Sequence, residues 1–216
     1  MFGLLFTLLA CAPEDAWENT TFACASSAVA CEQQMIADFG LEADYPEDER
    51  QLLLAATHEL LTWDLGQWPP TSPEPEVQAL VLLLQDTPGD TTAQRSYNFV
   101  ANAVDRTVLA PEDADFSFRF VFGRLSVRLG GFAYNTATAL VHEASHSRVP
   151  VHEVCSDGYD CDRSWLSAYC VQAGIALLAL ESCEEERDGT PRDGPPVSCR
   201  ELEHTWEVIR DRVRPR

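Results

Sequence analysis

The segment 136–148 constrains the fold of this chain most, because it places His142 and His146 four residues apart in a run of helix-forming residues. In an α-helix, residues four apart lie about one turn apart on the same face, so both imidazoles can reach one point. The apolar positions of the segment fall on the opposite side, and they are Ala137, Leu140, Val141 and Ala144. The spacing therefore predicts an amphipathic helix that packs one face inward and presents the histidines on the other.

Upstream of this helix, the apolar spacing changes from the helical period to a period of two. Aromatic and aliphatic residues alternate with polar ones over residues 116–129, and the parity of the alternation flips at Gly123. Such alternation is typical of strands, and a glycine at the flip is typical of a tight turn or a bulge. We therefore expect a small antiparallel strand region before the histidine helix.

Helical spacing accounts for most of the remaining chain. Apolar periodicity and turn signals predict a poorly defined helical segment over 20–39 and clearer helices over 46–62, 75–85, 92–109, 163–181 and 198–213. Residues 182–197 are rich in proline, glycine and glutamate, which predicts a polar loop. No repeat or linker divides the chain, so we expect residues 11–216 to form one mainly helical α+β domain.

The charge of the chain argues against a nucleic acid partner. Fifteen lysines and arginines stand against thirty-five aspartates and glutamates, which gives a formal net charge of −20. A phosphate backbone requires neutralising cations, and this surface would repel it. No stretch reaches the roughly 18 to 20 apolar residues that a membrane-spanning helix needs, so the sequence predicts no transmembrane segment.

The first eleven residues suggest export. Residues 2–10 form a short apolar run, and Leu8-Leu9-Ala10-Cys11 at its end resembles the lipobox of bacterial lipoprotein signals. The resemblance implies that residues 1–10 are removed, that Cys11 carries lipid, and that this lipid is the membrane contact. It also implies an address in the bacterial cell envelope, on the periplasmic or the cell-surface face. The run is short and no basic residue precedes it, so the alternatives are that the true start lies upstream or that residues 1–10 form an ordinary buried N-terminus.

The remaining cysteines fit an oxidising compartment. Pairing near neighbours that bracket polar loops leaves Cys170 as a buried thiol and gives three disulfides, Cys24 with Cys31, Cys155 with Cys161, and Cys183 with Cys199. A four-thiolate zinc site is the rival interpretation. We rank it lower because no pair of cysteines has the two-residue spacing that such sites favour.

The run His142-Glu143-Ala144-Ser145-His146 has the H-E-x-x-H pattern, and it resembles the signature of the zincin metalloproteases. The resemblance covers about residues 116–152. It implies a zincin-like fold, a zinc ion held by both histidines, and Glu143 as the general base and acid of a water-mediated hydrolysis of peptide bonds. The substrate would be a peptide or a protein. The alternative is a non-catalytic metal-binding or structural lipoprotein of the cell envelope.

A third zinc ligand is needed if one coordination position is to stay open. His152 follows His146 by six residues, as in the metzincin pattern, so we expect it to be that ligand. Val149 replaces the metzincin glycine, and methionine occurs only at positions 1 and 35, which leaves no Met-turn. The chain therefore resembles zincins in general more closely than metzincins. Acidic alternatives for the third ligand are Glu153, Asp157, Asp160 and Asp162.

Other residues near the pattern have candidate or structural roles. Tyr159 and Tyr169 follow the histidine helix and are candidates to stabilise an oxyanion, although either could be an ordinary packing residue. His58 precedes a glutamate in the same way as His142, but Thr62 stands where a second histidine would be required. We therefore expect His58 to be a surface residue of its helix, and we expect His204 to be structural.

Overall fold

The computed structural model describes part of the chain, and the described part is mainly helical, as the sequence predicts. The described residues are 28–42, 44–104, 106–109, 118–121, 124–127, 136–149, 153–154, 160–161, 167–187 and 199–213. Within them, no helix is both long enough and apolar enough to cross a membrane. The predicted signal segment 1–10 and the predicted lipidation site Cys11 lie outside the described residues.

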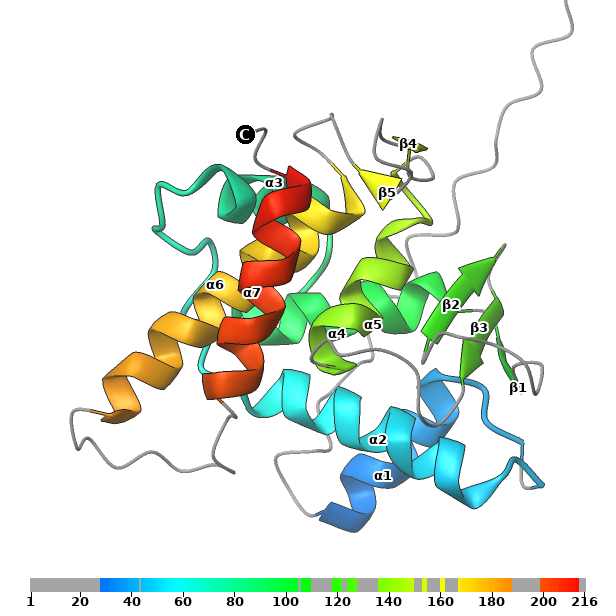
Figure 1. The fold of residues 1–216 in the computed structure, drawn as a ribbon. Coiled ribbons are helices and arrows are strands. Elements are labelled where there is room, and N and C mark those ends of the chain that lie inside the picture. The colour runs from blue at the N-terminus through cyan, green and yellow to red at the C-terminus, as the bar shows by residue number, and fades with distance from the viewer. Residues whose placement is uncertain are drawn as a thin grey trace, which may run out of the picture.

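α5 lies near the middle of the fold, where it packs against α2, α4 and α6 and beside β2 (Figure 1). In chain order the helices are α1 Ala28–Asp38, α2 Glu47–Thr62, α3 Pro75–Leu84, α4 Thr92–Ala103, α5 Thr136–Ser145, α6 Ala168–Arg187 and α7 Cys199–Val213. The predictions for α2, α3 and α7 are confirmed to within a residue or two. Local signals explain several starts: α2 opens on three acidic residues, and α3 has Pro75 in its first turn.

Two predicted helix boundaries outside the histidine helix are wrong. The helix predicted over 92–109 ends at Ala103, and the β-strand Arg106–Leu109 follows it. This strand contains the β-branched residues Thr107 and Val108, which fit a strand better than a helix. The loop predicted over 182–197 also begins too early, since α6 continues to Arg187. The glutamates and the arginine of this last turn have good helix propensity, so a run of charged residues here is not a loop signal.

The strands before α5 form a mixed sheet, so the expectation of an antiparallel strand region is not confirmed. The three strands are β1 Arg106–Leu109, β2 Phe118–Val121 and β3 Arg124–Val127, in the order β1-β3-β2. β3 pairs antiparallel with β2 but parallel with β1. Alternation in the sequence cannot specify the partner of a strand, and the apolar spacing over 92–109 predicts a helix where β1 lies. Gly123, the predicted turn or bulge, lies outside the described residues.

A second, smaller pairing follows α5. β4 Glu153–Val154 and β5 Asp160–Cys161 are antiparallel, with Glu153 opposite Cys161 and Val154 opposite Asp160. These strands are two residues long. They bring the two ends of the segment downstream of α5 together, and that segment contains most of the third-ligand candidates.

The main hydrophobic core collects side chains from all seven described helices, with Leu202 from α7, and encloses the apolar face of α5. Ala137, Leu140 and Val141 are fully buried, so the predicted inward face of this helix is confirmed. α3 and α6 approach each other so closely that a Cβ atom at Gly174 would overlap the backbone carbonyl of Glu76. A glycine at this point of α6 therefore determines how closely the two helices can pack.

α7 packs against α6 and forms a separate apolar cluster there (Figure 1). Tyr169 and Ala173 of α6 contact Ile209 of α7, with Trp206 and Val213 packed around them. The predicted disulfide between Cys183 and Cys199 is present and joins the end of α6 to the start of α7. Cys170 is buried, as expected. The other two predicted pairs each include a residue outside the described part, Cys24 in one and Cys155 in the other. The pairs Cys24 with Cys31 and Cys155 with Cys161 therefore stay predictions.

Removing this disulfide is expected to destabilise the protein by about 3 kcal/mol, because the bond closes a loop with a sequence separation of 16. The measurement is the free energy of unfolding of a Cys183→Ala/Cys199→Ala double variant. Cys170→Ala serves as the control, since it removes a buried cysteine outside this pair and should cost about 1 kcal/mol at most. A double variant as stable as the parent would contradict the prediction.

Candidate metal site

The histidine helix ends earlier than the sequence predicts. α5 stops at Ser145, and His146 begins a tight turn in which the backbone N–H of His146 donates to the carbonyl of Glu143, at 3.2 Å. The backbone N–H of Arg148 donates to the carbonyl of Ser145, at 2.9 Å. Such three-residue bonds tighten the last turn of a helix, and Pro150 cannot continue one because it has no N–H to donate. His146 nevertheless stays on the same side of the chain as His142.

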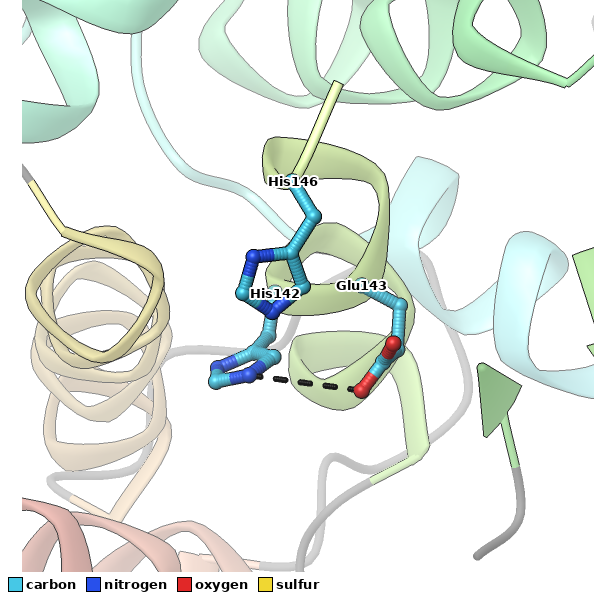
Figure 2. Close-up of side chains that lie close together, drawn as sticks. All are labelled: His142, Glu143 and His146. Carbon is cyan, nitrogen blue, oxygen red and sulfur yellow. Dashed lines mark ion pairs between the residues drawn. The ribbon is translucent and has the colours of Figure 1, made fainter. Parts of the chain in front are cut away.

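The structure brings together the three chemical groups that the spacing predicts. The imidazoles of His142 and His146 lie on one side of α5, one above the other, and the Glu143 carboxylate lies alongside His142 (Figure 2). The centroids of the two imidazole rings are 5.2 Å apart, and the rings are nearly perpendicular. The Nε2 atom of His142 lies 4.0 Å from Oε1 of Glu143. Among the described residues, these side chains form the one group of three or more that could hold a metal ion.

The donor atoms of this triad fit a divalent cation that accepts nitrogen and oxygen ligands. One ligand atom from each of His142, Glu143 and His146 lies within 4.8 Å of the others. Two ligands of a tetrahedral zinc ion, each about 2.0–2.1 Å from it, lie roughly 3.4 Å apart. Small side-chain rotations would therefore bring the imidazoles to that separation. The residue types and their placement fit a borderline divalent cation, because such ions accept imidazole nitrogen and carboxylate oxygen.

No family model, curated protein or solved structure matches this chain. A function can therefore be argued only from the residues of the chain and their geometry.

The three side chains differ in how deeply they are buried. His142 is only 6% exposed, whereas Glu143 and His146 are half-buried. The Glu143 side chain keeps 21% of its surface accessible, so its carboxylate can meet a small molecule that approaches from solvent. Electrostatic interactions are stronger at a half-buried position than in water because the local dielectric constant is lower. The site thus combines one enclosed imidazole with a more accessible imidazole and a carboxylate.

Contacts from three other helices hold α5 and the turn that follows it in place. The Arg148 Nη1 atom donates to the backbone carbonyl of Leu83 in α3, at 2.9 Å, and its guanidinium lies over the ring of Phe99 in α4. In the first turn of α5, Thr138 Oγ1 accepts from Nε2 of Gln172 in α6, at 3.3 Å. These contacts lie on both sides of the histidines. The backbone that carries the site is therefore tied to the core.

Tyr169 lies directly beside the triad. Its ring centroid is 4.7 Å from that of His142, with an angle of 60° between the ring planes, and Tyr169 is 7% exposed. Tyr169 stands at the start of α6, twenty-seven positions after His142 by residue number. Sequence spacing named it only as one of two tyrosines downstream of the pattern. No periodicity links the two helices, so the direct ring contact could not be predicted.

The remaining predicted site residues are not brought into the triad by the described part of the structure. His152, the predicted third ligand, and the oxyanion candidate Tyr159 lie outside the described residues, as do Asp157 and Asp162. Glu153 and Asp160 lie in β4 and β5, where only the backbone is described. The predicted surface position of His58 is confirmed, since it is exposed on α2, and His204 is exposed on α7.

Proposed function

We propose that this protein is a zinc-dependent peptidase that resembles the zincins. The observation that carries the proposal is the gathering of His142, Glu143 and His146 at the end of one helix, with ligand atoms within 4.8 Å of one another. The two histidines would hold the ion, and His152 is the proposed third ligand, with Glu153, Asp157, Asp160 and Asp162 as alternatives. When bound, a zinc ion lowers the pKa of water toward 7 and polarises a carbonyl group.

Glu143 is the proposed general base and acid. Its Oε1 atom lies 4.0 Å from Nε2 of His142, so a water molecule next to that imidazole would also lie within reach of the carboxylate. The carboxylate would take the proton of the attacking water and deliver it to the leaving amine of the peptide. Tyr159 and Tyr169 stay candidates to donate a hydrogen bond to the oxyanion.

The proposed setting is the bacterial cell envelope. The lipobox-like run that ends at Cys11 supports export and a lipid anchor, with cleavage after residues 1–10. The disulfide between Cys183 and Cys199 is consistent with an oxidising compartment. The proposed substrate is a peptide or a protein. The net charge of −20 argues against nucleic acid.

A second function is favoured by two observations, the burial of His142 and its contact with the Tyr169 ring. An enclosed imidazole would also suit an ion that only braces the fold. In this non-catalytic alternative, the protein would bind a divalent ion without hydrolysing peptides. The two functions share the metal site and differ in whether Glu143 performs proton transfer.

Metal binding by the histidine pair is tested by titration with Zn²⁺. We expect His142→Ala and His146→Ala each to weaken Zn²⁺ affinity by about 100-fold or more. Loss of a residue that only orients a metal ligand typically weakens metal affinity by about 10- to 100-fold, and loss of a ligand itself should weaken it at least as much. The measurement is Zn²⁺ affinity by competition with a chromophoric chelator. His152→Ala, measured in the same way, reports on the third ligand.

His58→Ala is the matched control. His58 also precedes a glutamate on a helix, but it is exposed on α2 and lies outside the triad, so this variant should bind Zn²⁺ like the parent. Equal affinity in the parent, His142→Ala and His146→Ala would refute the metal site and, with it, both functions proposed here.

A further inference from the structure

We propose that Tyr169 is a positioning residue, whose ring holds the His142 imidazole in the orientation that metal binding requires. The inference rests on the proposed metal site and adds to it a residue that orients one of its candidate ligands. It concerns the aromatic ring of Tyr169 rather than its hydroxyl group. Tyr169, whose ring contacts His142 from another helix, thereby acquires a role distinct from that of an oxyanion donor.

The ring contact has the geometry of a packed aromatic pair. The centroids of His142 and Tyr169 are 4.7 Å apart at an interplanar angle of 60°, within the range that edge-to-face pairs prefer. The two residues are 6% and 7% exposed, so the imidazole cannot turn freely without displacing the tyrosine. The imidazole of His142 also contacts His146 edge-on. His142 is therefore held between a second candidate ligand and a ring supplied by α6.

Tyr169 is itself fixed from behind by α7. It belongs to the small cluster with Ala173 and Ile209, around which Trp206 and Val213 pack. The apolar residues of α5 belong instead to the main core. The contact between Tyr169 and His142 thus links the triad to a cluster that is separate from the core beneath it. The disulfide between Cys183 and Cys199 ties the two helices of that cluster together.

A positioned ligand binds metal more tightly than a mobile one, because less rotamer freedom is lost on binding. Outer partners that orient metal ligands typically contribute 10- to 100-fold to metal affinity. Tyr169 should therefore act on affinity through its ring. Phenylalanine at position 169 should preserve metal affinity, because phenylalanine keeps the ring and lacks only the hydroxyl. Leucine has no ring and should not preserve it.

The test is a titration of the full chain with Co²⁺, whose visible absorption reports the ligand geometry. We expect Tyr169→Leu to weaken Co²⁺ affinity by about 10-fold or more and to alter the absorption spectrum, and Tyr169→Phe to stay within about threefold of the parent. Ile209→Ala, which removes the support from α7 and leaves Tyr169 in place, should cause a smaller loss in the same direction.

Tyr97→Leu is the matched control. Tyr97 is also a buried tyrosine, at 2% exposure, but its ring pairs with Phe39 and its hydroxyl donates to Asp38, in the main core. Loss of this ring should lower stability without changing Co²⁺ affinity at temperatures where the variant is folded. The inference is overturned if Tyr169→Leu binds Co²⁺ like the parent, or if Tyr169→Phe is weakened as much as Tyr169→Leu.

A measurement without metal separates this inference from the proposed function. The ring current of Tyr169 should shift the His142 ring protons in the NMR spectrum of the metal-free protein, and Tyr169→Leu should remove that shift while Tyr97→Leu retains it. A parent that binds neither Zn²⁺ nor Co²⁺ refutes the proposed function. Unchanged His142 resonances in Tyr169→Leu refute the positioning role, whatever the parent binds.

Discussion

Replacing Glu143 with glutamine is expected to lower peptide hydrolysis by about 100- to 10,000-fold while Zn²⁺ affinity stays close to that of the parent. Glutamine has nearly the same shape as glutamate, but its amide cannot accept the proton of the attacking water. The carboxylate of Glu143 lies 4.0 Å from the nearest imidazole nitrogen of His142, where it can serve a water molecule next to the ion. The measurements are turnover of a fluorogenic peptide mixture and zinc content by elemental analysis.

Glu59→Gln is the matched control for this substitution. Glu59 follows His58 on α2, so it has the same local sequence context, but it lies outside the candidate metal site. Its replacement should change turnover by less than about twofold. If Glu143→Gln cleaved peptides at the parental rate, Glu143 would not be the base. A parent that binds zinc and cleaves no peptide would instead favour the bracing role of the ion.

The second large effect concerns stability. Gly174→Ala is expected to destabilise the protein by about 3 kcal/mol, although alanine is the better helix former by about 1 kcal/mol. The added Cβ atom would lie 2.8 Å from the carbonyl carbon of Glu76 and closer still to its oxygen. These are backbone atoms of α3, so no side-chain rotation relieves the overlap and the two helices must move apart. The measurement is the free energy of unfolding in urea.

Gly66→Ala isolates the contribution of the overlap. Gly66 has a φ of +76°, but no atom lies within 4 Å of the position its Cβ would occupy. This variant should lose only the 1–2 kcal/mol, roughly, that a left-handed backbone costs a residue with a side chain. Equal losses at Gly66 and Gly174 would show that α3 and α6 can separate at little cost. A stabilised Gly174→Ala would show that helix propensity outweighs the contact.

Local sequence patterns predicted the inward face of α5 and the starts of α2 and α3. The apolar positions of α5 repeat at the helical period, and Ala137, Leu140 and Val141 are fully buried as that period requires. The same spacing placed His142 and His146 together, because one turn of helix separates them. Proline and acidic residues marked the starts of α2 and α3. In each case the cause of the structure lies within a few residues of the chain.

Features that depend on distant partners could not be predicted. Arg106–Leu109 pairs parallel with Arg124–Val127, and no local pattern specifies that partner. The approach of Tyr169 to His142 depends on how α5 and α6 pack, and the sequence between them contains no signal for it. The placement of His142, Glu143 and His146 could therefore be predicted, because one helical turn determines it. The contacts that support the site from α6 and α7 could not.

The packing of α7 behind Tyr169 makes the proposed site depend on a helix that supplies none of its ligands. Ile209 and Trp206 of α7 cover the tyrosine, and Cys199 at the start of α7 joins this helix to the end of α6 through Cys183. Loss of α7 would leave both histidines in the chain and would take away the support behind Tyr169. A change far from the histidines in sequence could thereby reach the proposed site.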